Sequence, residues 1–280
     1  MTAGLLVTFR EGLEAFLVVG IILSYLGRAD LNGYKRWIYA ASLLGLVSAF
    51  VLGLIFQLTY TGFESGIGRL YFKLVIMGFA VAVLSYMILW MSRNSRNIKG
   101  EVEQAVESAV TTGSMVTISL LAYVAILREG FETVLFLGAI FGDEMSTPVL
   151  YGGVLGLVIA LAVTIGFFKG MRSLSLRLFF KMTGVLILLI AAGLLTNMVG
   201  IMQEAQLLPV FKESLFDISR FISASSEPGM LLKALFGYTP APSLLQALSY
   251  ATYFVFAISI LYRTGEKERR KGRVNEAATV

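Results

Sequence analysis

The chain has 280 residues, of which 57% are hydrophobic and only 15% are charged, whereas soluble domains have about 25% charged residues. Its 23 basic and 18 acidic residues give a formal charge of +5, but the basic residues lie between apolar stretches and form no patch for nucleic acid, which we therefore exclude as a partner. The absence of cysteine and histidine excludes disulfides, thiolate zinc sites, histidine-ligated haem and Ser-His-Asp catalysis. Any metal site must therefore consist mainly of oxygen ligands.

Seven apolar stretches are each long enough to form a membrane-spanning helix, which needs about 20 mostly apolar residues. We predict an all-α integral membrane protein with seven transmembrane helices at residues 3–27, 36–59, 70–92, 114–141, 149–169, 178–202 and 243–262. The first stretch has no basic residue before it and contains Arg10, Glu11 and Glu14. Because a cleavable signal peptide has a basic start and an uncharged centre, we interpret this stretch as a retained helix.

The basic residues also predict the orientation of these helices, because Lys and Arg are enriched in short cytoplasmic loops. With the N-terminus outside, sixteen Lys and Arg residues fall on the cytoplasmic side and five on the outer side. We therefore expect an N-out, C-in topology. The basic tail after residue 262 would then contact anionic lipid at the inner surface of the bilayer.

The two halves of the chain share a common pattern. Three stretches recur in order: 10–14 at 128–132, 44–47 at 155–158, and 69–73 at 177–181. Each copy contains three predicted helices, an odd number, so the two copies must cross the membrane in opposite directions, as in many secondary transporters. We predict a first repeat at 1–92, a cytoplasmic linker at 93–113, a second repeat at 114–202, an extracytoplasmic loop at 203–242, a seventh helix at 243–262 and a cytoplasmic tail at 263–280.

The first of these repeated stretches places charges inside the membrane. Arg10-Glu11-Gly12-Leu13-Glu14 and Arg128-Glu129-Gly130-Phe131-Glu132 carry six charged groups, which would cost on the order of 15–21 kcal/mol if the costs were additive. The two glutamates of each motif are three residues apart and share one helix face. Because transporters of this plan keep their sites at the repeat interface, we predict that Glu11, Glu14, Glu129 and Glu132 together form a cation site.

The other motif residues are expected to support this site. Arg10 and Arg128 each lie four residues before a glutamate, Glu14 and Glu132, so we predict that each arginine pairs with that glutamate while the site is empty. Gly12 and Gly130 are predicted to let the two motif helices approach closely. An alternative interpretation is that each motif is a structural ion pair that braces the helix bundle.

Paired Arg-Glu-x-x-Glu motifs in the first and fourth spans, together with Gln203-Glu204-Ala205 and Phe236-Gly237-Tyr238, resemble the oxidase-dependent iron transporter family. This family comprises fungal high-affinity iron permeases and bacterial EfeU-type ferric permeases, and the resemblance covers essentially the whole chain. It implies a multi-pass protein of the bacterial inner membrane whose motif glutamates bind iron as transported substrate, with no permanently bound cofactor. It also implies an extracytoplasmic partner, either a multicopper oxidase, a cupredoxin-like protein or a haem peroxidase, that oxidises or delivers the iron.

The residues alone leave other functions open. Carboxylates suit Fe³⁺ but also Mg²⁺, Ca²⁺ and Mn²⁺, so iron and its ferric state are implied only by the resemblance. One alternative is a permease for another cation such as Mn²⁺ or Pb²⁺. Another is a membrane-embedded carboxylate-bridged metalloenzyme, against which the absence of histidine argues. We expect a transporter rather than an enzyme, and the chain has no P-loop that would make it an ATPase.

Three further acids are candidates for the two ends of an ion pathway. Glu204 follows the sixth predicted span on the outer side, where iron would arrive. Glu103 and Glu107 lie on a predicted cytoplasmic amphipathic helix, where iron would depart. For the second pair, a solvated helix face is the alternative interpretation.

Overall fold

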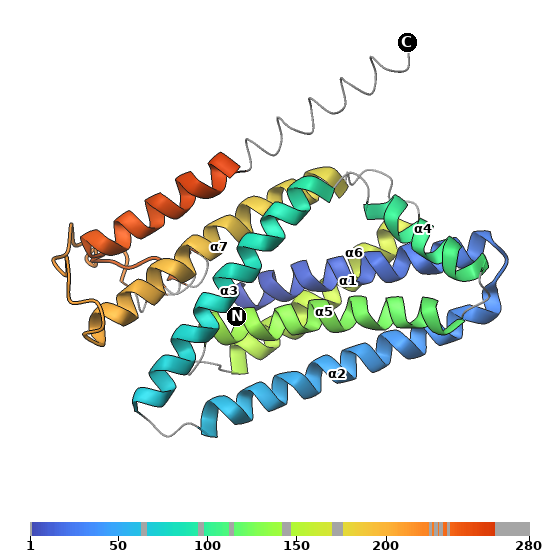
Figure 1. The fold of residues 1–280 in the computed structure, drawn as a ribbon, viewed down its shortest axis with the longest axis horizontal. Coiled ribbons are helices and arrows are strands. Elements are labelled where there is room, and N and C mark those ends of the chain that lie inside the picture. The colour runs from blue at the N-terminus through green and yellow to red at the C-terminus, as the bar shows by residue number, and fades with distance from the viewer. Residues whose placement is uncertain are drawn as a thin grey trace, which may run out of the picture. The chain divides into compact units, whose positions relative to one another are not determined.

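The computed structural model describes residues 2–62, 66–94, 98–111, 115–141, 147–169, 176–223, 226, 229, 232–233 and 236–260, and these residues are almost entirely helical. The helices are α1 (Thr2–Arg28), η1 (Asn32–Tyr34), α2 (Lys35–Gly62), α3 (Ile67–Asn94), α4 (Ile98–Thr111), α5 (Met115–Phe141), α6 (Thr147–Lys169) and α7 (Leu176–Glu204) (Figure 1). A shorter apolar helix follows at Leu244–Ile260. The protein is therefore all-α in the residues described.

Four helical segments are long and apolar enough to cross a membrane: Asn32–Gly62, Ile67–Trp90, Thr147–Phe168 and Thr183–Glu204. Helices α1 and α5 have 27 residues each, but they carry the motif charges. Large apolar side chains are exposed along α2 and α6, including Phe50 and Tyr151, which are 67% and 69% exposed. Extended apolar surfaces of this kind mark contact with lipid or protein, so the chain is a multi-pass membrane protein.

The helices form two compact units, and each unit takes helices from both predicted repeats. The first unit contains 1–72 and 97–175, and the second contains 73–96 and 176–280. Helices α1, α2, α4, α5 and α6 therefore belong to the first unit. Both charged motifs lie on α1 and α5, so the candidate site is contained within the first unit.

In the first unit, α1 packs mainly against α6, and α2 packs mainly against α5. Gly156 of α6 lies so close to α1 that an added Cβ would overlap the Leu5 carbonyl oxygen and the Thr8 hydroxyl. The Thr8 hydroxyl also donates a hydrogen bond of 2.8 Å to the Gly153 carbonyl oxygen. Glycine is required at 156 because only a residue without a side chain permits this approach.

The α2–α5 pair makes the equivalent contact. A Cβ on Gly45 of α2 would lie 3.0 Å from the Tyr123 carbonyl oxygen and 3.0 Å from Ile126 Cβ on α5. Tyr123 and Ile126 follow their counterparts on α1 by 118 residues, and Gly45 precedes its counterpart on α6 by 111. These are the offsets at which the sequence stretches recur, so equivalent positions of the two halves make equivalent contacts.

In the second unit, the segment after α7 is tied to neighbouring helices. Gln203 donates a hydrogen bond of 2.8 Å to the Val210 carbonyl oxygen and accepts one of 2.6 Å from the Ser243 hydroxyl. Gly237 has a φ of +65°, and its backbone lies against Gly193 of α7 so closely that neither position has room for a Cβ. These contacts hold the described part of this segment against α7 and the start of the final helix.

Candidate cation site

The two charged motifs lie in the interiors of α1 and α5, and most of their charged residues are buried. Arg10, Glu11, Glu129 and Glu132 are 4%, 1%, 8% and 7% exposed. Both helices continue through the motifs without interruption, so the charges do not mark helix ends. Buried charges of this kind need compensation from partners or bound ions.

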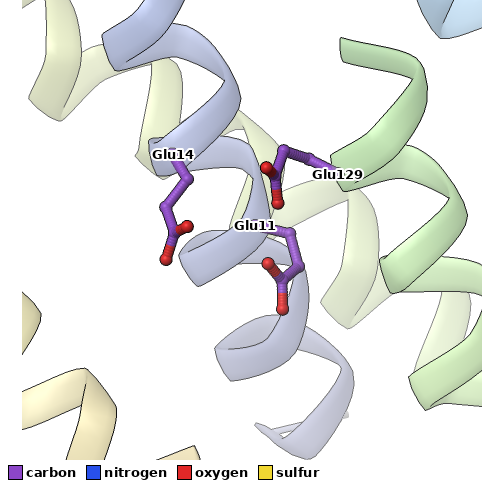
Figure 2. Close-up of side chains that lie close together, drawn as sticks. All are labelled: Glu11, Glu14 and Glu129. Carbon is purple, nitrogen blue, oxygen red and sulfur yellow. The ribbon is translucent and has the colours of Figure 1, made fainter. Parts of the chain in front are cut away.

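Three of the four motif glutamates converge. Glu11, Glu14 and Glu129 each place one carboxylate oxygen within 4.8 Å of the others. Figure 2 shows the first two on successive turns of α1 and the third reaching toward them from α5. Glutamates three apart share a helix face, and the packing of α1 on α5 brings the second motif against that face. Glu132 is not a member of this group.

Arg10 holds both glutamates of its own motif. Its Nη2 donates a hydrogen bond of 2.6 Å to Glu14 Oε1, the pairing that the four-residue spacing predicts, and its Nη1 donates to Glu11 Oε1. The second pairing was not expected, since adjacent residues of a helix point in different directions. It forms because a guanidinium can present separate nitrogens to two carboxylates.

Arg128 has a similar pairing but a different environment. Its Nε donates a hydrogen bond of 3.0 Å to Glu132 Oε1, as predicted, and lies 3.7 Å from Glu129 Oε1. The Arg128 side chain is 45% exposed, whereas that of Arg10 is 5% exposed. The second arginine is therefore held less tightly than the first.

Among the residues that the structure describes, three buried carboxylate oxygens have no hydrogen-bond partner. They are Glu11 Oε2, Glu129 Oε2 and Glu132 Oε2. In each case Oε1 faces an arginine, so one oxygen of the carboxylate is compensated and the other is available. Buried acceptors without partners are rare and costly, and oxygen ligands of this kind suit a hard cation. Two of these three oxygens belong to the converging glutamates.

The structure corrects the role expected for the motif glycines. A Cβ on Gly12 would lie 2.9 Å from Leu157 Cδ1 and 3.3 Å from Ala160 Cβ, both on α6, and a Cβ on Gly130 would overlap Ala49 of α2. These glycines therefore admit α6 and α2, and do not face each other between α1 and α5. The physical reason is that each glycine directly follows a motif glutamate, so it points about 100° away from that glutamate around the helix and lies off the face that carries the carboxylates.

The other candidate acids that the structure describes are not members of this group of glutamates. Glu204 is the last residue of α7 and is exposed, and Glu107 is exposed on α4. Glu103 lies on α4, but its side chain lies outside the described part of the structure, as does the basic tail at 263–280. Among the described residues, the group close enough to share a metal ion contains none of these acids.

Residues 1–265 match the iron permease FTR1 family. The chain is 33% identical over 259 residues to the ferrous iron permease EfeU of Yersinia pestis, which covers 92% of each protein. It is 36% identical over 260 residues to the ferrous iron permeases EfeU of Escherichia coli O6:K15:H31 (strain 536 / UPEC) and Shigella sonnei (strain Ss046), covering 91% of this chain and 92% of each relative. No solved structure matches the chain.

Proposed function

The chain belongs to the iron permease FTR1 family, and from this premise we propose that it imports iron across a bacterial inner membrane through the glutamates of α1 and α5. Its family and relatives are permeases, so the chain is a transporter rather than an enzyme. The observation that supports this site most directly is the convergence of Glu11, Glu14 and Glu129 within 4.8 Å.

The proposed topology has seven spans, N-out and C-in, formed by α1, α2, α3, α5, α6, α7 and the helix Leu244–Ile260. Helices α1 and α5 have 27 residues each, about 40 Å at 1.5 Å per residue, which is long enough to cross the bilayer. The equivalent α1–α6 and α5–α2 contacts support an inverted repeat. Such a repeat places the glutamates near the membrane midplane, where transporters of this plan bind substrate.

The geometry suggests how a bound cation replaces an arginine as the partner of a motif glutamate. Four carboxylates and two guanidiniums sum to −2 in the empty site, which attracts a cation. Arg10 pairs with both Glu11 and Glu14 while no ion is bound. An arriving ion binds the available oxygens of Glu11 and Glu129 and takes over Glu14 from Arg10. In the proposed topology Glu132, which is paired with Arg128, lies one turn to the outer side of Glu129 on α5, so an ion arriving from outside meets it before Glu129.

For the oxidation state, we propose that Fe²⁺ reaches the outer surface and that Fe³⁺ crosses the membrane. The relatives are named ferrous iron permeases, and we propose Fe²⁺ as the iron supplied to this chain from outside, whereas an all-carboxylate site suits the harder ferric ion for transport. An extracytoplasmic multicopper oxidase, cupredoxin-like protein or haem peroxidase would accept one electron from each Fe²⁺ and pass on Fe³⁺. Glu204, exposed at the end of α7, is a candidate for the first contact.

The first test is iron uptake by proteoliposomes or by cells that lack other iron importers. Glu14→Gln and Glu129→Gln should each lower uptake at least about tenfold. The reason is that loss of a carboxylate from a metal site weakens metal binding by about tenfold or more. Glu213→Gln is the matched control, because this acid is exposed and lies outside the cluster. Near-normal uptake by both cluster variants, with all proteins inserted equally, would contradict the carboxylate site.

The same uptake assay shows which metal ion, and which oxidation state of iron, is transported. We expect uptake with Fe³⁺ preloaded outside, or with Fe²⁺ plus an oxidant, and little uptake with Fe²⁺ kept reduced. Preferred uptake of reduced Fe²⁺ would overturn the ferric proposal and leave iron import standing. Preferred uptake of Mn²⁺ or Pb²⁺ would favour the rival cation permease.

A further inference from the structure

A continuous apolar cluster fills the space between four helices of the first unit. Its nine buried members come from α1, α2, α4 and α5: Ala15, Val19, Ile22, Leu26, Ile38, Val106, Ile118, Ala122 and Ile126. Four of them, one or more from each of α1, α4 and α5, have no exposed surface: Ile22, Leu26, Val106 and Ala122. Packed apolar interiors of this kind hold no continuous water.

This cluster begins directly beside the glutamates and extends in one direction only. On α1 it starts at Ala15, next to Glu14, and ends at Leu26 near the end of the helix. Leu26 lies twelve positions after Glu14 on the helix, a rise of about 18 Å at 1.5 Å per residue. On α5 it runs from Ile118 to Ile126, three residues before Glu129. In the proposed topology both stretches lie on the cytoplasmic side of the glutamates.

Helix α4 covers the far end of the cluster. It packs against α1 and α5, and Figure 1 shows it beside the ends of these two helices. Val106 is buried in the cluster, while Gln104, Glu107 and Ser108 are exposed, so α4 is amphipathic with its apolar side on the bundle. Because α4 lies between the two repeats, the duplication provides no second copy of it for the outer end.

We infer that this apolar cluster is the closed inner gate of the permease and that α4 is its lid. A cation that leaves the glutamates toward the cytoplasm between α1 and α5 would have to enter a packed apolar region, where an ion without ligands or water is prohibitively unfavourable. Passage therefore requires α4 to separate from α1, so that Val106 leaves the cluster and water enters. This gate presupposes the import function and the orientation proposed above.

Cross-linking tests whether α4 must move. The chain contains no cysteine, so Val106→Cys can be combined with Leu26→Cys or with Ile22→Cys and oxidised without competing thiols. A disulfide in either pair should lower iron uptake at least about tenfold, and reduction should restore it. If α4 only braces the bundle, a disulfide that keeps it in place leaves uptake unchanged, and that result would overturn the gate.

The matched control joins two exposed positions of α4 itself. It combines Gln104→Cys with Ser108→Cys, two positions on one face of α4. In the structure the Ser108 hydroxyl donates a hydrogen bond of 2.8 Å to the Gln104 carbonyl oxygen. Bridging this pair with a short bifunctional thiol reagent leaves α4 free of α1 and should not change uptake. Absence of any disulfide in both test pairs would contradict the packing of Val106 against α1 on which the gate depends.

A second readout separates the gate from the transport function. If the wild-type protein imports no iron, the proposed function fails, and the gate is judged on the Ala122→Cys variant alone. A gate that opens predicts slow modification of this thiol by a charged, water-soluble reagent from the cytoplasmic side, and none from outside. Absence of modification from the cytoplasmic side would show a permanently closed cluster and would refute the gate.

Discussion

Two arginines at equivalent positions of the two motifs differ in their burial and in the number of carboxylates that they hold closely. Arg10 is 5% exposed in its side chain and pairs with both Glu11 and Glu14, whereas Arg128 is 45% exposed and is 3.0 Å from Glu132 but 3.7 Å from Glu129. A buried pair is costly to break, because the remaining charge stays buried without compensation. Arg128 is itself half-exposed, but its partners Glu129 and Glu132 are buried, so its loss also leaves buried carboxylates without compensation.

We therefore expect Arg10→Gln to lower the free energy of unfolding by about 3 kcal/mol or more, and Arg128→Gln to lower it by less, because Arg128 is half-exposed and is hydrogen-bonded to Glu132 but 3.7 Å from Glu129. The stability of Arg10→Lys should lie between those of the wild type and Arg10→Gln, because an ammonium group retains the charge but cannot present two nitrogens in a fixed plane to two carboxylates. Thermal unfolding of the purified proteins in detergent measures the order of stability of these variants. Equal losses for the two Gln variants would contradict the difference in burial.

At this scale the sequence predicts pairs within a helix better than contacts between helices. The pairs Arg10–Glu14 and Arg128–Glu132 follow from a four-residue spacing and are present. The convergence of three glutamates rather than four depends on how α1 and α5 are shifted along each other, and helical spacing within one segment carries no information on that shift. For the same reason the sequence does not indicate that Gly12 packs against α6 rather than α5.

At the scale of the helix, the predicted spans and the observed helices agree to within a few residues at most ends, because long apolar stretches end where charges and glycines begin. Which helices pair could not be predicted, since α2 and α6 expose similar apolar side chains along much of their length. The main contacts are α1 with α6 and α2 with α5. Glycine positions determine how closely these pairs approach.

Three single substitutions of glycine by alanine should therefore change the stability of the protein by different amounts. At Gly156 the Cβ would overlap backbone of α1, at Gly45 it would lie 3.0 Å from α5, and at Gly184 of α7 it would meet nothing within 4 Å. Gly156→Ala should destabilise the protein by about 1–3 kcal/mol through overpacking, and Gly45→Ala by less. Gly184→Ala should be neutral or stabilising by up to about 1 kcal/mol, as alanine favours a helix.

Thermal stability in detergent again provides the measurement, with Gly184→Ala as the matched control for loss of glycine flexibility. Iron uptake should fall for Gly156→Ala, because Thr8 and Leu5 lie two and five residues before Arg10 on α1 and the motif would shift with them. A stability of Gly156→Ala equal to that of Gly184→Ala would mean that α1 and α6 are not packed as closely as the structure shows.

At the scale of the whole molecule, the main question is whether the charged helices α1 and α5 cross the membrane. Hydropathy identifies α2, the apolar part of α3, α6 and α7, but not α1 or α5. The compact first unit nevertheless packs α1 on α6 and α5 on α2. A helix packed lengthwise along a spanning helix is itself placed in the membrane, which favours seven spans over five.

Two introduced cysteines distinguish these topologies. Glu107 on α4 and Phe221 after α7 are exposed, the latter to 88%, and the chain between them contains α5, α6 and α7. If α5 spans, three crossings place the two positions on opposite sides of the membrane. If α5 does not span, two crossings place them on the same side. We expect a membrane-impermeant maleimide to label Phe221→Cys on intact cells and Glu107→Cys only after permeabilisation, while the cysteine-free parent chain stays unlabelled; labelling of both or neither on intact cells would exclude the seven-span topology.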